Sequence, residues 1–291
     1  MTLELHWKDP NFAWLAPAKL NLFLHITGQR ADGYHLLQSV FQFLDYSDTL
    51  YFENNNTGLI RILPNVEGVN LEDNIIYKAA MALKDRFHIN HGVEIKLKKI
   101  LPMGGGLGGG SSDAATTLLA LNKIWDINAS KEELMEIGLN LGADVPVFIF
   151  GQSAWAEGVG EHLTGIDLPE QWFLTIFPNI HINTGTIFSS TELTRDKDPI
   201  KIRDFLQGST ENVCQPVVEK LYPEVKEALN WLDKYADARL TGTGACLFAK
   251  FDNELEAREV AKKVPVKWQH FVAQGLNKTQ IEQFYWGIAK R

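Results

Sequence analysis

The alternation of apolar and polar positions predicts a half-buried β-strand near the start of the chain. Within residues 19–26, leucine or isoleucine occupies every second position, and the intervening positions include Lys19 and Asn21. Side chains two residues apart on a strand point the same way, so Lys19 and Asn21 are expected to lie side by side. After a glycine turn, a second strand is predicted with Tyr34 and His35 at its mouth. In isolation such a lysine is more often a solvated charge, and such a Tyr-His pair is more often structural.

The same patterns divide the rest of the first half into short strands and helices. Asn74 is expected to cap one helix, and Ser130 with Glu133 reads as the capping box of another, which stops at Gly142. The predicted strands are residues 34–44, 48–63, 93–98 and the buried run 147–150, and a surface loop at 54–56 interrupts the second of them. Residues 151–165 carry the sequence signals of a loop.

The segment that follows Gly142 predicts a rigid corner. Pro146 is expected to force Val145 out of helical geometry, and this leaves Asp144 on a tight turn. Taken alone, an aspartate in such a turn is more often a local cap than a catalyst.

The second half predicts a separate α+β unit, so we expect two domains, residues 1–165 and 166–291. Its order of strands and helices is typical of a ferredoxin-like α+β sandwich. The expected elements are strands at 172–177 and 271–273, helical stretches over 217–235, a glycine turn leading into a strand within 239–251, and a helix capped by Asn253.

The most informative segment is residues 102–115, which read PMGGGLGGGSSDAA. Glycines let successive backbone N–H groups point into one concavity, and a helix N-terminus adds its own donors and the positive end of its dipole. A helix with periodic Ala and Leu follows at once, and Ser111, Ser112 and Asp113 are expected to cap it. The segment therefore predicts a phosphate-binding loop, whereas a flexible linker would not open into such a helix.

Composition and charge exclude several other classes of protein. The chain has 291 residues, 45% of them hydrophobic and 22% charged, which is typical of a soluble globular protein. Its net charge is 28 − 36 = −8 without a long basic run, so neither nucleic acid nor a membrane surface is an expected partner. Two distant cysteines, Cys214 and Cys246, suit reduced thiols, and no signal or spanning segment is apparent, so a cytoplasmic location is expected.

The glycine loop fits neither of two common phosphate-binding patterns. Gly104, Gly106 and Gly109 satisfy the G-x-G-x-x-G spacing of dinucleotide-binding folds, but a second helix rather than a strand follows the loop's helix. Gly105 and Gly110 have the spacing of a P-loop, yet Ser111 stands where that loop requires lysine. The counter-charge must therefore come from a distant lysine and from a divalent metal ion.

Residues 102–115 resemble the ATP motif of the galactokinase, homoserine kinase, mevalonate kinase and phosphomevalonate kinase superfamily, the GHMP kinases. Four further motifs in the order of that superfamily resemble its members that act on a cytidine-diphosphate-linked methylerythritol: APAKLNLFL at 16–24, RADGYH at 30–35, LGADVP at 141–146 and LTGTGA at 240–245. The resemblance spans most of the chain.

This resemblance implies a two-domain α+β fold, with an N-terminal mixed β-sheet and helices like ribosomal S5 domain 2 and the C-terminal ferredoxin-like sandwich. It implies transfer of the γ-phosphoryl group of ATP, with Mg²⁺, to the 2-hydroxyl of the cytidylated methylerythritol in non-mevalonate isoprenoid synthesis. The partners would be small molecules, and the enzyme a monomer or weak homodimer. The alternative is another GHMP kinase that acts on a small alcohol without cytidine.

Individual roles also follow from the resemblance. Asp144 is the implied catalytic carboxylate, and Lys19 is its cationic partner. The implied ATP-binding residues are Pro102, Met103, Gly104, Gly105, Gly106, Leu107, Gly108, Gly109, Gly110, Ser111 and Ser112, together with Asn74 and Lys99 on the adenosine side; Lys99 has the alternative of a solvated strand-end lysine.

The implied substrate pocket combines stacking with directed hydrogen bonds. Tyr34 would stack on the cytosine while His35 reads its edge; Phe188 would cover the other face, with Thr184 as a polar contact beside it and Asn21 near the methylerythritol. Residues 241–244 are expected beneath the phosphates, or else as a purely structural turn. Ser112 is a candidate for the metal-binding serine and Glu157 a guess for the metal-binding glutamate, so the metal ligands stay unassigned.

Overall fold

The first half of the chain is organised around two long antiparallel strands. A computed structural model describes residues 8–64, 68–208 and 211–282. Strand β1 (Trp14–Gln29) pairs along its length with β2 (His35–Asn55), which also pairs with β4 (Gly92–Lys98) and β5 (Ala154–Glu157). Strand β3 (Ile60–Leu63) runs parallel to β4, and β6 (His162–Gly165) pairs with β5. Both β1 and β2 are longer than predicted, and β2 includes two of the three asparagines expected in a loop.

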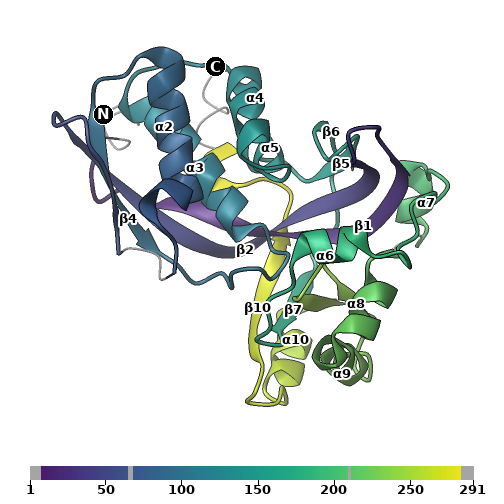
Figure 1. Cartoon of the computed structure of the whole chain (residues 1–291). Helices are drawn as coiled ribbons and strands as arrows, with labels where there is room; N and C mark the ends of the chain where they lie inside the picture. The colour runs from purple at the N-terminus through teal and green to yellow at the C-terminus, as the bar shows by residue number, and fades with distance from the viewer. Residues whose placement is uncertain (1–7, 65–67, 209–210, 283–291) are drawn as a thin grey trace.

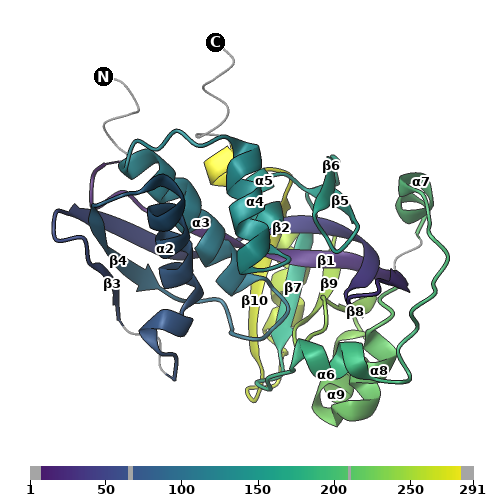
Figure 2. The same ribbon diagram turned by 45° about the horizontal axis from the view of Figure 1, so that its top comes forward.

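Four helices cover one face of this sheet (Figures 1 and 2). They are α2 (Ile75–Phe87), which follows the 3-10 turn η1 (Leu71–Asp73), α3 (Gly109–Ile124), α4 (Lys131–Leu141) and α5 (Val145–Phe150). The Asn74 side chain accepts a hydrogen bond from the backbone N–H of Ile76, and Ser130 and Glu133 form the predicted capping box. These two helix starts are confirmed.

Three predictions in this half are wrong. Residues 147–150 belong to α5 and not to a strand, because a short, unbroken apolar run suits either element. Val145 begins that helix, since proline is well accommodated in a first helical turn. The expected loop at 151–165 contains β5 and β6.

The second half forms the expected ferredoxin-like unit. Its strands are β7 (Trp172–Phe177), β8 (Ala238–Leu240), β9 (Leu247–Phe251) and β10 (Gln269–Leu276), in the antiparallel order β10-β7-β9-β8. The helices are α6 (Thr184–Ser189), α7 (Ile202–Leu206), α8 (Gln215–Leu221), α9 (Pro223–Leu232) and α10 (Glu254–Ala261). The predicted helical stretch is thus divided at Tyr222, and Asn253 caps α10 as expected.

Strand β10 connects the two halves (Figure 1, yellow). Its end pairs with β2 through Gly275 and Leu276, while the rest of β10 pairs with β7. One large core lies between the first sheet and helices α2–α5, and another lies between the second sheet and its helices. Cys214 and Cys246 are both free and buried. Across the described parts of the chain, no helix is long and apolar enough to cross a membrane.

Candidate active site

The glycine loop lines a cavity of about 450 Å³ at the start of α3. Gly104, Gly106 and Gly108 all have positive φ, and Gly108 is the N-cap of the helix. The predicted capping by Ser111, Ser112 and Asp113 is wrong, because these residues lie inside the first turns of α3. Backbone N–H groups at the helix start therefore stay available to an anion, as expected for a phosphate site.

The two serines of the loop lie in different surroundings. Ser111 lines the cavity, whereas Ser112 is fully buried and its Oγ has no hydrogen-bond partner among the described residues. Successive side chains on a helix point about 100° apart, so Ser111 and Ser112 face different directions. Ser111 is thus the serine that lines the glycine-loop cavity.

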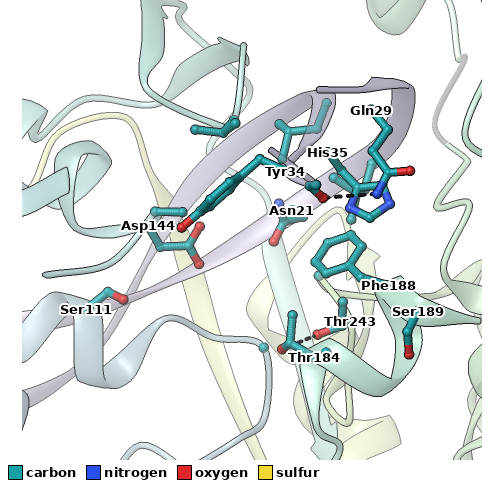
Figure 3. A pocket seen from close by; sticks show the side chains of 18 of the residues that line it. Asn21, Gln29, Tyr34, His35, Ser111, Asp144, Thr184, Phe188, Ser189 and Thr243 are labelled. Atoms are coloured by element: carbon teal, nitrogen blue, oxygen red, sulfur yellow. Dashed lines mark hydrogen bonds between the residues drawn. The ribbon is translucent and has the colours of Figure 1, made fainter. Parts of the chain in front are cut away.

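A second cavity, of about 730 Å³, lies between the two halves of the chain. Figure 3 shows Asp144 and Ser111 on one side of it and His35, Phe188 and Thr184 on the other. Asn21 and Tyr34 also line it, so all five residues proposed for substrate binding face one space. Strands β1 and β2 supply Asn21 and His35, the turn before β2 supplies Tyr34, and α6 supplies the other two.

The two cavities meet at Asp144. Gly106, Ser111 and Asp144 line both cavities, and Asp144 Oδ2 lies 3.3 Å from Lys19 Nζ. The Lys19 side chain is only 3% exposed, whereas that of Asp144 is 38% exposed. A carboxylate that a ligand can reach is therefore held beside a buried ammonium group.

Hydrogen bonds hold Lys19 in this position. Its Nζ donates to the carbonyl oxygen of Gly106 at 2.9 Å and to Asn21 Oδ1 at 2.6 Å. Asn21 Nδ2 in turn donates to Ser39 Oγ at 2.8 Å. The expected side-by-side placement of Lys19 and Asn21 is confirmed, and the alternative of a solvated lysine is wrong.

A second glycine turn packs against the glycine loop. The backbone N–H of Cys246 donates to the Gly105 carbonyl at 2.9 Å, and Thr241 Oγ1 accepts from the backbone N–H of Asn21 at 2.9 Å. Thr243 Oγ1 lies 2.9 Å from Thr184 Oγ1 at the wall of the larger cavity. Residues 241–244 thus connect the loop, β1 and α6.

Lys99 bridges two carboxylates beside the glycine loop. Its Nζ lies 2.5 Å from Asp48 Oδ2 and 2.7 Å from Asp113 Oδ2, so the alternative of a solvated strand-end lysine is wrong. Burial raises the pKa of Asp113 to about 7, with Lys99 opposing this shift and Asp48 adding to it. Lys99 and the helix-capping Asn74 both line the glycine-loop cavity.

Stacked rings form the far wall of the larger cavity. The rings of His35 and Phe188 lie 5.0 Å apart at an interplanar angle of 20°, while the Tyr34 side chain is exposed. The sequence reasoning missed Arg195, whose Nε donates to His35 Nε2 at 3.2 Å. No sequence pattern marks Arg195, because it lies outside the helices and strands and its partner His35 is distant in the sequence.

The structure offers few groups for a metal ion. The described residues contain no cluster of three or more His, Cys, Asp or Glu side chains suited to a metal. Glu157 accepts a hydrogen bond from Gln38 and lines neither cavity. Asp144 and Ser111, whose side chains carry the oxygen ligands that Mg²⁺ prefers, both line the glycine-loop cavity.

The fold and the paired cavities define a kinase of the GHMP class. Residues 74–152 match the model of the GHMP kinases N terminal domain, and residues 190–270 match that of the GHMP kinases C terminal domain. The chain is 53% identical over 264 residues to a 4-diphosphocytidyl-2-C-methyl-D-erythritol kinase of Nitrosococcus oceani, covering 91% of this chain and 94% of that protein. A kinase of the same name from Tolumonas auensis is 53% identical over 271 residues, 93% of this chain and 95% of the relative. The chain therefore belongs to the 4-diphosphocytidyl-2-C-methyl-D-erythritol kinase family.

Solved structures agree with this assignment. A crystal structure of 4-(cytidine 5'-diphospho)-2C-methyl-D-erythritol kinase superposes with a TM-score of 0.79 at 29% identity, covering 90% of this chain and 98% of the other. A homoserine kinase from Cytophaga hutchinsonii superposes with a TM-score of 0.66 at 16% identity, covering 92% and 95% of the two chains. The second similarity shows the fold alone.

Proposed function

We propose that this chain transfers the γ-phosphoryl group of ATP to the 2-hydroxyl of 4-diphosphocytidyl-2-C-methyl-D-erythritol, giving the 2-phosphate and ADP, in non-mevalonate isoprenoid precursor synthesis. The observation that carries the proposal is the place of Asp144, at the junction of the two cavities and 3.3 Å from Lys19. A donor in one cavity and an alcohol in the other would meet at this carboxylate.

The glycine loop is suited to the ATP phosphates. Backbone N–H groups at the start of α3, together with the positive end of its dipole, stabilise negative charge without a lysine in the loop. Lys99 and Asn74 line the same cavity and are proposed for the adenosine side. When bound, Mg²⁺ would neutralise phosphate charge, and Ser111 and Asp144 are the side chains whose oxygens would hold it with the phosphates.

Asp144 and Lys19 are suited to the chemical step. Phosphoryl transfer depends mainly on alignment and on stabilising charge, and a carboxylate orients the attacking hydroxyl and accepts its proton. The buried ammonium group of Lys19 pairs with this carboxylate and stabilises the negative charge that develops on the attacking oxygen. Its bonds to Gly106 and Asn21 keep this charge at one position, so little reorganisation accompanies the reaction.

The larger cavity is suited to a nucleotide-linked alcohol. Tyr34 and Phe188 supply aromatic faces for the base, and His35 supplies a directed hydrogen bond. Thr184, beside Thr243, offers a hydroxyl near the same end, while Asn21 lies beside Lys19 at the reacting end. The cavity therefore has room and polarity for a base at one end and an alcohol at the other.

A coupled assay of ADP release tests the proposal. Purified protein with ATP and Mg²⁺ is offered the cytidylated methylerythritol, mevalonate, homoserine and galactose in parallel. Turnover of the cytidylated substrate alone supports the proposal. Preference for another alcohol would instead indicate a different GHMP kinase, and ATP binding without any turnover would indicate a catalytically silent relative.

A further inference from the structure

Arg195 connects the base-binding histidine to the helix that carries the stacking phenylalanine. Its Nη2 donates to the carbonyl oxygens of Phe188 at 2.6 Å and Ser190 at 2.7 Å, at the end of α6. Its Nη1 donates to the Leu193 carbonyl at 3.1 Å, and its Nε donates to His35 Nε2 at 3.2 Å. One guanidinium group, with its rigid fork of donors, thus serves four acceptors from two parts of the chain.

This contact determines the protonation of His35. A guanidinium group can only donate, so His35 Nε2 must present its lone pair and the ring proton must lie on Nδ1. Burial, and then the positive charge of Arg195, lower the pKa of His35 below its ordinary value of 6.5. The ring is therefore neutral and, while the contact lasts, limited to the Nδ1–H tautomer.

Few other charges act on this ring. The strand partner of His35 is Gln29 and its stacking partner is Phe188, neither of which is ionisable. The turn before β2 carries Arg30 and Asp32, which pair with each other at 2.6 Å. Arg195 is thus the charge that contacts His35 directly.

We propose that Arg195 is a positioning residue that sets His35 as a hydrogen-bond donor to the substrate's base and holds Phe188 in place beside it. The proposal rests on the proposed function, because it assigns the base to this end of the cavity. A donor at this point suits the acceptor atoms O2 and N3 of cytosine, whereas N3 of uracil carries a proton. Arg195 would therefore contribute to the choice of base without touching it.

The tautomer can be measured without any substrate. ¹⁵N chemical shifts of the His35 imidazole in the full-length protein, assigned with a His35→Gln variant, distinguish a protonated Nδ1 from a protonated Nε2. We expect Nδ1–H alone in the wild type and a mixture of tautomers in Arg195→Met, which keeps the aliphatic stem but removes every donor. Protonated Nε2 in the wild type would overturn the proposal, whether or not the variant folds.

Kinetics then separate positioning from general structure. In Arg195→Met, the KM for the cytidylated substrate is expected to rise about 5- to 20-fold, while kcat and the KM for ATP change less than about threefold. Lys197→Met is the matched control, because it removes a cation on the same segment whose partner is the exposed Glu211. An unchanged KM in folded Arg195→Met, or an equal change in the control, would overturn the proposal.

The pH profile is a second readout, one that a merely structural role would not change. Between pH 8 and pH 5.5 the wild-type KM should be nearly constant, since His35 carries its Nδ1 proton throughout. In Arg195→Met the KM should improve at the acidic end of this range, as the pH falls toward the pKa of His35, which burial still keeps below 6.5, because the imidazolium form again carries a proton on Nδ1. A parallel profile in the two proteins would contradict the tautomer assignment.

If the wild-type protein did not turn over the cytidylated substrate, the proposed function would fail, while the NMR result would still decide the tautomer of His35.

Discussion

Asp144 is the residue on which the proposed chemistry depends most. Asp144→Asn preserves the shape of the side chain and its contact with Lys19 but removes the negative charge, so kcat is expected to fall about 100-fold or more with little change in the KM for ATP. Steady-state ADP release, with circular dichroism to confirm folding, makes the measurement. A loss of only a few-fold would assign the chemical step to another group.

Tyr34 is expected to contribute to binding rather than to catalysis or folding. Its side chain is 61% exposed, so Tyr34→Ala should leave the melting temperature unchanged. Loss of base stacking worth about 1–3 kcal/mol should raise the KM for the cytidylated substrate by about 5- to 150-fold, with kcat nearly constant. Tyr235→Ala, an exposed tyrosine remote from both cavities, is the control. Unaltered KM values would remove Tyr34 from the substrate site.

At the scale of elements, the glycine loop depends on its close approach to the second glycine turn. A Cβ at Gly106, which has a φ of +77°, would lie 2.5 Å from the Thr241 carbonyl oxygen. Gly106→Ala is therefore expected to lower both the melting temperature and the affinity for ATP. At Gly110 a Cβ would have no neighbour nearer than 3.8 Å, and Gly110→Ala should leave the free energy of unfolding unchanged or raise it by up to about 1 kcal/mol. Equal melting temperatures for the two variants would contradict this view of the loop.

The bridge from Lys99 to Asp48 and Asp113 connects β2, the end of β4 and α3, and it should make stability depend on pH. The pKa of Asp113 is about 7 in the folded protein and near 3.9 in an unfolded chain, so the folded state binds the extra proton between these values. The free energy of unfolding should therefore fall as the pH rises from about 4 to 7. In Asp113→Asn the fall should be smaller, as measured by melting temperatures at pH 5 and pH 8. The exposed Asp126→Asn is the control; the same slope in all three proteins would contradict the assignment.

At the scale of the whole molecule, β10 unites two halves that each have a core of their own. Because β10 pairs with both β2 and β7, and because the second glycine turn packs on the first, we expect the halves to unfold together. Differential scanning calorimetry should show one transition whose calorimetric and van't Hoff enthalpies agree. Two separate transitions would indicate that residues 1–165 and 166–291 are independently stable domains.

Local chemistry made much of this molecule predictable from its sequence. The Asn74 cap, the capping box at Ser130 and the glycine loop before α3 depend on neighbouring residues, so they were visible as short patterns. Local patterns failed at residues 147–150, where an unbroken apolar run lacks the periodicity that separates a helix from a strand. They also failed for the predicted capping by Ser111, Ser112 and Asp113, because α3 begins at Gly109 and Gly108 is its N-cap.

The sequence by itself indicated most of the elements and, through its resemblance to known kinases, predicted the phosphate-binding loop and the pairing of Lys19 with Asp144. Only the tertiary structure decided that Lys19 is buried against Asp144 where two cavities meet, that Lys99 is held between two carboxylates, and that Arg195 contacts a histidine 160 residues away. The reason is physical: a side chain's burial, charge environment and protonation depend on neighbours that folding brings together from distant parts of the chain.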